Sequence, residues 1–350
     1  MLNITDQILT KGSSSLRSEG TYQPNKSRDK FSLDHFASSS FDYKKALSLA
    51  EASKLAYENE TTVKTTVLNV WGFTACEFLT TGSTQAFVAQ TDQVILVAFR
   101  GTESSLEDWL GNMDIRTVSK SYGNVHKGFA AHYENIKEKF GAILANSNAA
   151  GKSLWLTGHS LGGAIATIAA AELKSQYEIS GIYTYGQPRV GFDSLRSFIK
   201  TNYAEKFFRF VNQDDPIVLL PWKGARDWQD VGQLIHMTGT AAITPSLQSS
   251  NKIAGGPASL SQAEFQNLLK TITKFKQDLK AKRNSIIRPK LRDKPVDYKW
   301  PMDITNKYKK IKETHEKSFG QMKGQYLSVD DHSLDNYIAA LHKLSQIQVS

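Results

Sequence analysis

The sequence has almost no cysteine and no long apolar run. Cys76 is the only cysteine among 350 residues, so no disulfide can form within the chain, and a reducing compartment is the simplest location. The absence of a run of about eighteen apolar residues argues against a transmembrane helix. The first residues, Met1 to Asp6, also lack the basic region and apolar core of a Sec signal peptide. We therefore expect a protein that is not transmembrane and that is either cytoplasmic or exported by a route without such a signal.

Positive charge is concentrated in one part of the chain. The formal net charge is +9, and hydrophobic residues make up 40% of the sequence, enough for a packed core in one large α/β domain or two smaller ones. Residues 251–325 contain 18 Lys and Arg against 7 Asp and Glu. Since this surplus exceeds the net charge, the basicity of the protein belongs to this segment alone.

One stretch carries a motif of nucleophilic catalysis. A short apolar run, Lys152 to Thr157, predicts a buried strand, and the small residues from Ile165 to Leu173 predict a close-packed helix. Between them lies Gly158-His-Ser160-Leu-Gly162-Gly163, a G-x-S-x-G turn. A serine at such a strained turn needs glycines two positions away on each side, because a Cβ there would collide with the strand or the helix. The sequence therefore predicts a nucleophile elbow with Ser160 as the nucleophile and Leu161 N–H facing a developing oxyanion.

The rest of the chain alternates strands and helices around this elbow. Helical spacing predicts helices over Lys44 to Tyr57 and Ala130 to Leu144, and alternation predicts antiparallel strands over Val63 to Val70, Ala75 to Leu79 and Gln85 to Gln90. Apolar runs predict buried strands over Gln93 to Arg100, Ile182 to Gly186 and Phe207 to Val211. Strands that alternate with helices indicate a largely parallel sheet covered by helices.

Candidate partners for Ser160 lie at loops that follow these strands. The strand at Gln93 to Arg100 ends in Gly101-Thr102, which puts a backbone N–H at the ligand-binding edge of an open sheet. A reactive serine needs a histidine base and a carboxylate that orients it, and in elbow enzymes the chain order is serine, acid, histidine. Asp214 and Asp215 are the candidate acids. The candidate bases that follow them are His236, His315, His332 and His342.

Seven motifs follow one another along the chain. They are Phe99-Arg-Gly-Thr102, Trp109-x-x-Asn112, His126-x-Gly-Phe129, Gly158 to Gly163, Tyr185-Gly-x-Pro-Arg-Val-Gly191, Asn212-Gln-Asp-Asp215 and Asp331-His332-Ser-x-x-Asn-Tyr337. In this order they resemble the motifs of the fungal-type class 3 lipases, a family of the α/β-hydrolase superfamily. The resemblance implies an α/β-hydrolase fold, with a largely parallel central sheet flanked by helices. It also implies a triad of Ser160, Asp215 and His332 and an oxyanion hole at Thr102 and Leu161. His159, inside the elbow, is interpreted as a packing and hydrogen-bonding residue, and no metal or cofactor is expected.

The resemblance further implies a lid and an activity. Ser104 to Asn112 would form a short amphipathic lid with an apolar face, which consists of Leu106, Trp109, Leu110 and Met113. The implied activity is that of a serine carboxylester hydrolase acting on lipids, an acylglycerol (triacylglycerol) lipase that works through an acyl-enzyme. Two alternatives remain: a phospholipase A1 that acts on anionic membrane surfaces, and a catalytically inactive lipid-binding module on the same fold.

The basic segment departs from the family pattern. Asp215 and His332 are separated by 116 residues, more than a compact member of the family would need. We expect a disordered leader over 1–40, the hydrolase core over 41–245, a basic and mainly helical insertion over 246–325, and a C-terminal part of the core over 326–350 that carries the catalytic histidine. Gln262 to Ile287 predicts a basic amphipathic helix. This helix either packs on the core or docks the segment 252–325 on an anionic membrane; nucleic acid is not an expected partner.

Overall fold

The computed structural model describes residues 30–102, 116–213, 215, 217–221, 227–237, 243–246 and 329–347. The helices are α3 (Tyr43–Leu55), α4 (Glu60–Thr65), α6 (Lys127–Asn146), α7 (Leu161–Leu173), α8 (Asp193–Tyr203) and α11 (Leu334–Ile347), with shorter helical turns η1 (Leu33–Phe36), η2 (Thr66–Val70), η3 (Ala149–Gly151), η4 (Ile217–Leu219) and η5 (Val329–His332). The strands are β1 (Ala75–Thr81), β2 (Thr84–Gln90), β3 (Val94–Phe99), β4 (Thr117–Lys120), β5 (Gly123–His126), β6 (Ser153–His159), β7 (Ile179–Tyr185), β8 (Phe207–Asn212), β9 (Gln233–Met237) and β10 (Ile243–Ser246).

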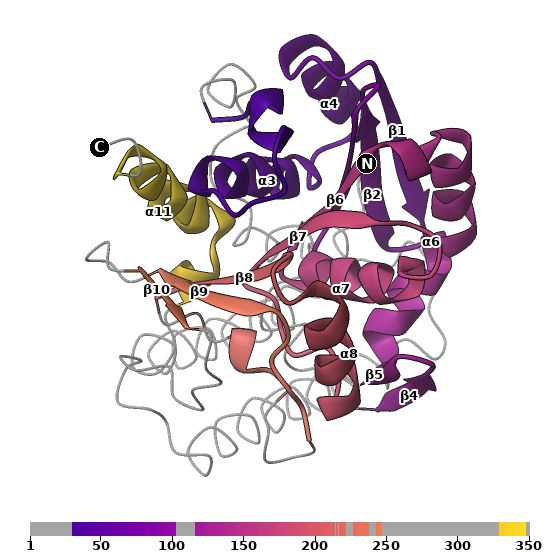
Figure 1. Cartoon of the computed structure of the whole chain (residues 1–350), viewed down its shortest axis with the longest axis vertical. Helices are drawn as coiled ribbons and strands as arrows, with labels where there is room; N and C mark the ends of the chain where they lie inside the picture. Colours follow the sequence, from indigo (N-terminus) through magenta and orange to yellow (C-terminus); the bar gives the residue numbers. More distant parts are fainter. Residues whose placement is uncertain are drawn as a thin grey trace, which may run out of the picture. The chain divides into compact units, whose positions relative to one another are not determined.

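Eight of the described strands form one sheet in the order β1-β2-β3-β6-β7-β8-β9-β10 (Figure 1). The strands β3, β6, β7, β8 and β9 are parallel, while β1, β2 and β10 join the sheet as antiparallel strands. Parallel strands end at the same edge, so the loops after β3, β6, β7 and β8 meet there. The predicted helix-covered, largely parallel sheet is confirmed.

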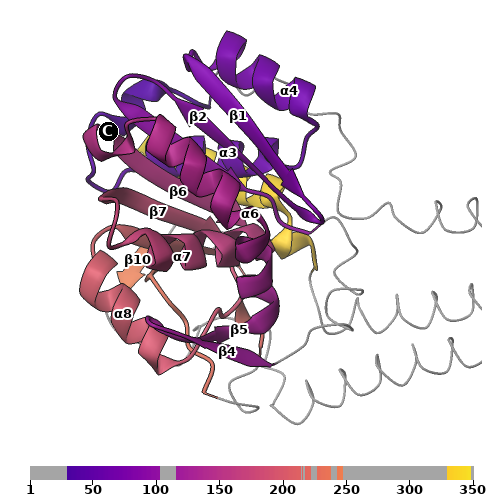
Figure 2. The ribbon, with the colours of Figure 1, turned by 90° about the vertical axis from the view of Figure 1, so that its right-hand side faces the viewer.

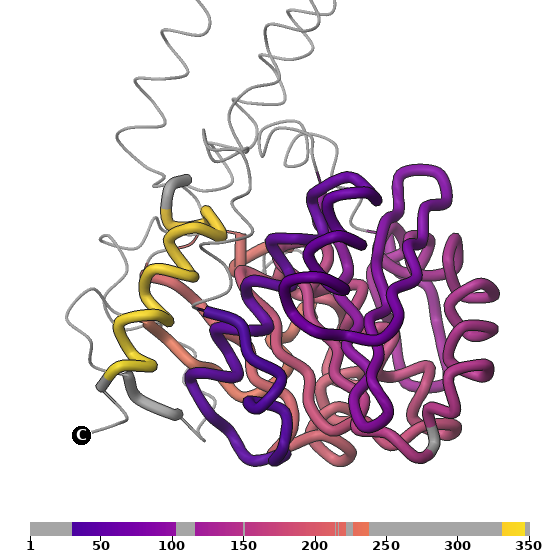
Figure 3. The backbone as a smooth tube through the Cα atoms, turned by 90° about the horizontal axis from the view of Figure 1, so that it is seen from above, coloured from indigo at the N-terminus to yellow at the C-terminus, as the bar shows by residue number. Residues whose placement is uncertain are grey.

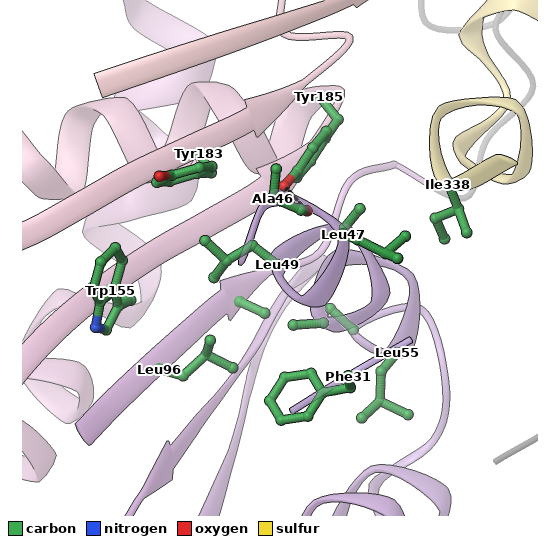
Figure 4. Close-up of a cluster of buried hydrophobic side chains, with 14 of the residues drawn as sticks. Phe31, Ala46, Leu47, Leu49, Leu55, Leu96, Trp155, Tyr183, Tyr185 and Ile338 are labelled. Atoms are coloured by element: carbon green, nitrogen blue, oxygen red, sulfur yellow. Dashed lines mark hydrogen bonds between the residues drawn. The ribbon is translucent and has the colours of Figure 1, made fainter. Parts of the chain in front are cut away.

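Helices cover both faces of this sheet. Figure 2 shows α6, α7 and α8 on one face, where the ring of Phe140 from α6 contacts the ring of Phe99 from β3 edge-on, 5.7 Å between centroids. On the other face, α3 and α11 run side by side (Figure 3) and pack on the alternate residues of the strands. Figure 4 shows the hydroxyl of Tyr185 pointing to Ala46 of α3, whose carbonyl oxygen accepts its hydrogen bond at 2.5 Å. The first and the last described helices thus complete a single core together with the strands.

The prediction of a strand over Val63 to Val70 is wrong. The segment forms α4 and the π-helical turn η2. The side chain of Asn59 caps α4 by accepting a hydrogen bond from Thr62 N–H at 3.0 Å. The two buried valines, Val63 and Val67, are four residues apart and therefore lie on one face of a helix. The β-branched residues of this run favour a strand locally, but the Asn59 cap and the four-residue spacing of the buried valines favour the helix.

The expectation of a disordered leader over 1–40 is wrong from residue 30 onward. The ring of Phe31 stacks on Trp71, with centroids 4.0 Å apart, and the ring of Phe36 contacts Trp155 edge-on at 5.4 Å. Both phenylalanines are buried. Their partners are far away in the sequence, so local periodicity could not reveal the packing that orders this segment. Residues 1–29 lie outside the described residues.

Two further predictions also fall outside the described part of the chain. One is the amphipathic lid over 104–112, together with Met113. The other is the basic insertion over 246–325, of which only Ser246, at the end of β10, is described; the helix predicted for Gln262 to Ile287 lies in the remainder. Within the ranges that the structure describes, no helix has the length and the apolar content to cross a bilayer.

Candidate active site

Ser160 lies at a strained turn between β6 and α7. Its backbone has φ 55° and ψ −126°, in a region that residues with a side chain rarely occupy. A Cβ on Gly158 would lie 2.7 Å from the backbone nitrogen of Gly163, and one on Gly162 would lie 2.9 Å from the carbonyl carbon of Arg100. Both distances are shorter than real Cβ contacts, so both positions require glycine. The strand, the turn and the helix of the predicted elbow are confirmed.

We expect the replacement of Gly162 with alanine to destabilise the fold strongly. The new methyl group would overlap the backbone at the end of β3, including the carbonyl oxygen of Phe99. This backbone is held in the sheet and cannot move away, so we expect the free energy of unfolding to fall by about 1–3 kcal/mol. Urea denaturation measures the change.

The matched control is Gly141→Ala within α6, where a Cβ would meet no atom within 4 Å. Alanine is the better helix former, so the free energy of unfolding should rise by about 0.5–1 kcal/mol. Equal shifts of the urea midpoint in the two variants would contradict the steric argument.

Two backbone segments meet beside the elbow as the sequence predicted. Leu161 is the first residue of α7, and the first N–H groups of a helix have no acceptor within the helix. Gly101 packs against the elbow from the end of β3, since a Cβ on it would lie 2.8 Å from the carbonyl oxygen of His159. Thr102 follows directly and is half-buried. The N–H groups of Leu161 and Thr102 thus belong to two segments in contact; their role as an oxyanion hole stays a prediction.

Asp215 and His332 lie in direct contact although 116 residues separate them. The Nδ1 atom of His332 lies 2.8 Å from Oδ2 of Asp215, and both side chains are buried. Asp215 comes just after β8 and His332 ends η5, directly before α11. The two segments are tied together by a hydrogen bond from Asn212 Nδ2 to the carbonyl oxygen of Asp331, at 3.2 Å.

The carboxylate of Asp215 accepts three hydrogen bonds. The bonds to Oδ2 come from His332 Nδ1 at 2.8 Å and from the hydroxyl of Tyr337 at 2.7 Å, and Ile217 N–H donates to Oδ1 at 2.9 Å. Burial by itself would raise the pKa of Asp215, but the neighbouring His332 and these donors outweigh it and lower the pKa. An ionised Asp215 accepts a hydrogen bond from the Nδ1–H group of His332, which leaves the lone pair of Nε2 for a proton from another group.

The end of β7 and the residue after it contact both Ser160 and this pair. Its backbone N–H donates to the carbonyl oxygen of Tyr185 at 2.9 Å. The next residue, Gly186, lies against the pair, because a Cβ there would lie 2.8 Å from both His332 Nδ1 and Asp215 Oδ2. Among the described residues, the hydroxyl of Ser160 makes no hydrogen bond to the His332 imidazole. Such bonds often tighten only when substrate binds, and the triad role of the three residues stays a prediction.

Two of the other candidate bases, His236 and His342, are described, and both lie away from this cluster. His236 lies on β9, as its apolar surroundings predicted, and its Nε2 is bonded to the carbonyl oxygen of Gln213 at 2.8 Å. His342 lies on α11 beside Gln346, with 3.1 Å between their Nε2 atoms. Asp214 and His315 lie outside the described residues. Among the described candidate bases, only His332 lies beside Asp215, and the choice of these two residues as acid and base stays a prediction.

Tyr337 is a residue of the site for which the sequence predicted no role. This residue belongs to the tail motif after His332 and is fully buried in α11, where its ring contacts Tyr185 edge-on at 6.2 Å. Its hydroxyl shares Oδ2 of Asp215 with His332. A signal was available: a tyrosine five residues after the base, on the apolar face of the next helix, points back toward the loop that holds the acid.

His159 is buried and hydrogen-bonded on both ring nitrogens, as the sequence predicted for a structural residue. Tyr57 Oη lies 3.0 Å from Nδ1, and the carbonyl oxygen of His332 lies 2.8 Å from Nε2. Burial, and then the nearby charge of His332, lower the pKa of His159 to about 3. His159 is therefore neutral across the pH range in which a free histidine titrates.

This burial predicts a loss of stability in mild acid. Below pH 6.5, the ordinary pKa of histidine, the unfolded chain binds a proton at position 159 and the folded chain does not. Lowering the pH from 6.5 toward 3 should thus reduce the free energy of unfolding by about 1.4 kcal/mol per pH unit from this residue. Urea denaturation from pH 7 to pH 4 measures the slope. His159→Gln, which cannot titrate, should show a slope shallower by this amount, and equal slopes would contradict the prediction.

The arrangement is suited to acyl transfer. It combines a hydroxyl on a strained turn, a buried imidazole bonded to a carboxylate, and backbone N–H groups at a helix start. Among the residues that the structure describes, no group of three His, Cys, Asp or Glu side chains is placed to hold a metal ion.

A strained serine between a strand and a helix, at the carboxyl edge of a mostly parallel sheet, is typical of the α/β-hydrolase fold, and this protein has that fold. Residues 96–224 match the model of the family Lipase (class 3). Over these residues the resemblance to class 3 lipases that the motifs predicted is confirmed.

The relatives include enzymes for two kinds of lipid. The chain is 35% identical over 132 residues to secreted mono- and diacylglycerol lipase 1 from Fusarium solani. The match covers 36% of this chain and 39% of that protein. It is 30% identical over 151 residues to a chloroplastic phospholipase A(1) from Arabidopsis thaliana. That match covers 36% of this chain and 33% of that protein. The chain thus spans well under half the length of these two relatives.

A solved structure supports the fold. The crystal structure of a mutant MDLA from Penicillium cyclopium superposes with a TM-score of 0.50 at 18% sequence identity, and covers 63% of this chain and 92% of that one.

Proposed function

We propose that this protein is a serine carboxylester hydrolase that acts on acylglycerols, with Ser160 as nucleophile, His332 as base and Asp215 as the residue that orients the base. The observation that carries the proposal is the buried hydrogen bond of 2.8 Å between His332 and Asp215, next to the strained Ser160. The acylglycerol lipase from Fusarium solani, which is similar over 132 residues, supports the substrate class.

The proposed reaction has two steps. Ser160 Oγ attacks the ester carbonyl while His332 Nε2 takes its proton, and Asp215 stabilises the imidazolium that forms. The N–H groups of Leu161 and Thr102 would bind the oxyanion. The intermediate then collapses: the ester C–O bond breaks, the leaving alkoxide takes the proton from His332, and an acyl-enzyme remains. Water, deprotonated by His332, releases the fatty acid and restores the Ser160 hydroxyl.

The experiment that tests this function compares two substrates. Emulsified diacylglycerol or triacylglycerol and vesicles of anionic phosphatidylglycerol are hydrolysed in parallel at low and high salt. Release of fatty acid mainly from the acylglycerol supports the proposal. Absence of hydrolysis, together with no labelling of Ser160 by a fluorophosphonate, contradicts it and favours an inactive lipid-binding module.

Phospholipase A1 activity is a second candidate, because the relative from Arabidopsis thaliana is a phospholipase A(1) and because residues 251–325 hold 18 Lys and Arg. Each basic residue near an anionic surface would contribute about 1 kcal/mol to binding, and salt weakens this attraction. Faster hydrolysis of phosphatidylglycerol that slows at high salt would select this candidate. A rate that is indifferent to lipid charge and to salt would remove the idea that the segment 252–325 docks on membranes.

A further inference from the structure

A chain of two hydrogen bonds leads from the end of α3 to the backbone of His332. Tyr57 lies in the turn after α3, and its Oη is 3.0 Å from Nδ1 of His159. On the other side of the ring, Nε2 is 2.8 Å from the carbonyl oxygen of His332. The rings of His159 and His332 are only 4.6 Å apart, centroid to centroid. His159, the residue before the proposed nucleophile, is therefore hydrogen-bonded to the backbone of His332, the proposed base.

The direction of both bonds follows from the chemistry of the groups. A carbonyl oxygen only accepts, so His159 must donate from Nε2 to His332. A neutral imidazole carries one proton, so Nδ1 is an acceptor and the Tyr57 hydroxyl donates a hydrogen bond to it. Burial lowers the pKa of His159 to about 3, which keeps the ring in this neutral form. Tyr57 thus selects the tautomer of His159 that can bind His332.

The two hydrogen-bonded residues, Tyr57 and His159, also contact the loop after β3, which leads to Thr102. A Cβ on Gly101 would overlap the hydroxyl of Tyr57, and it would lie 2.8 Å from the carbonyl oxygen of His159. Gly101 directly precedes Thr102, the predicted oxyanion residue. Tyr57 and His159 therefore lie where the loop after β3, the elbow and the loop of His332 meet.

We propose that His159 and Tyr57 are positioning residues for the hydrolase reaction: they hold the main chain of His332 so that its imidazole is aligned between Asp215 and Ser160. This inference rests on the proposed function. Asp215 contacts only one edge of the His332 ring, so a second restraint on the backbone is needed to fix the direction of Nε2. A displacement of about 1 Å of a reacting group can cost about a hundredfold in rate.

The test compares two substitutions of His159. Leucine fills the space but cannot donate, and we expect His159→Leu to lower kcat about 30- to 100-fold with little change in KM. The rate of fluorophosphonate labelling at Ser160 should fall by the same factor, because it depends on the same base. Glutamine can place an N–H near the position of Nε2, so His159→Gln should recover kcat to within about fivefold of the wild type.

The second arm removes only the hydroxyl of Tyr57. In Tyr57→Phe, no hydroxyl fixes the ring proton of His159 on Nε2, so we expect kcat to fall about 3- to 10-fold. The loss should be smaller when position 159 is already glutamine. The matched control is Tyr203→Phe, which removes a buried hydroxyl that donates to the carbonyl oxygen of Ala170 at 2.8 Å, away from the site. This control should lower the thermal midpoint but leave kcat unchanged.

The outcomes separate this inference from the proposed function. A wild-type chain without ester hydrolysis and without labelling would overturn the function itself. An active wild type with normal kcat in folded His159→Leu would overturn the positioning role alone. Equal losses in the leucine and glutamine variants would also overturn it, because the donated hydrogen bond would then not matter. Should His159→Leu fail to fold, full activity in Tyr57→Phe would decide against the proposal.

Discussion

Replacing Ser160 with alanine is expected to lower kcat for lipid ester hydrolysis by about 10⁶-fold, by analogy with the removal of nucleophiles from other serine hydrolases. The reason is that the hydroxyl is the only group proposed to form a covalent bond with the substrate. The backbone N–H groups that would bind the oxyanion remain, so a small residual rate over water should persist. Titration of released fatty acid measures kcat, and labelling by a fluorophosphonate should vanish at the same time.

Ser153→Ala provides the matched control for this variant. Ser153 lies on the same strand, β6, but at its other end, where its hydroxyl donates to the carbonyl oxygen of Gln93 at 3.1 Å. Its removal should leave kcat within about twofold of the wild type. Activity and labelling that survive Ser160→Ala would show that another residue is the nucleophile.

Replacing Asp215 with asparagine should cost about 10⁴-fold in kcat. Ile217 N–H donates to Oδ1 of Asp215, so the oxygen of the asparagine would stay there and its NH₂ group would face His332 and Tyr337. An NH₂ group donates, so His332 Nδ1 would have to accept and the proton would move to Nε2, the atom that should take the proton of Ser160. The base would be held in the wrong tautomer.

The rate of hydrolysis and the rate of fluorophosphonate labelling should fall together in Asp215→Asn, while the serine remains in place. Asp193→Asn is the control, since Asp193 is exposed in the first turn of α8 and has no contact with the site. Its kcat should match the wild type. A loss smaller than about tenfold in Asp215→Asn would show that another carboxylate orients His332.

Stability in acid and activity depend on different groups in the same cluster. His159 remains neutral because it is buried, and its pKa of about 3 makes it a source of acid instability. Asp215 remains ionised because three donors surround it. A polar cluster of this kind gains from being fully hydrogen-bonded, since each missing partner would leave a buried group unsatisfied.

Much of this fold and of the candidate site could be predicted from the sequence. The elbow was predictable because steric limits at Ser160 allow only glycine at positions 158 and 162, and such limits act within a few residues of each other. The order of serine, acid and histidine, together with the tail motif at His332, indicated the triad candidates. Most strands were predicted to within a few residues, because buried parallel strands are continuous apolar runs.

Only the tertiary structure decided the rest. Phe31 and Phe36 are ordered by aromatic partners that lie far along the chain, and Val63 to Val70 forms helical turns instead of a strand because its valines face the core four residues apart. The contact of His332 with Asp215, and the hydrogen bonds that link Tyr57 to His159 and His159 to His332, join segments that no local pattern relates. Sequence patterns report local sterics and periodicity, whereas the alignment of a buried base depends on which distant groups the packed core brings within hydrogen-bonding distance.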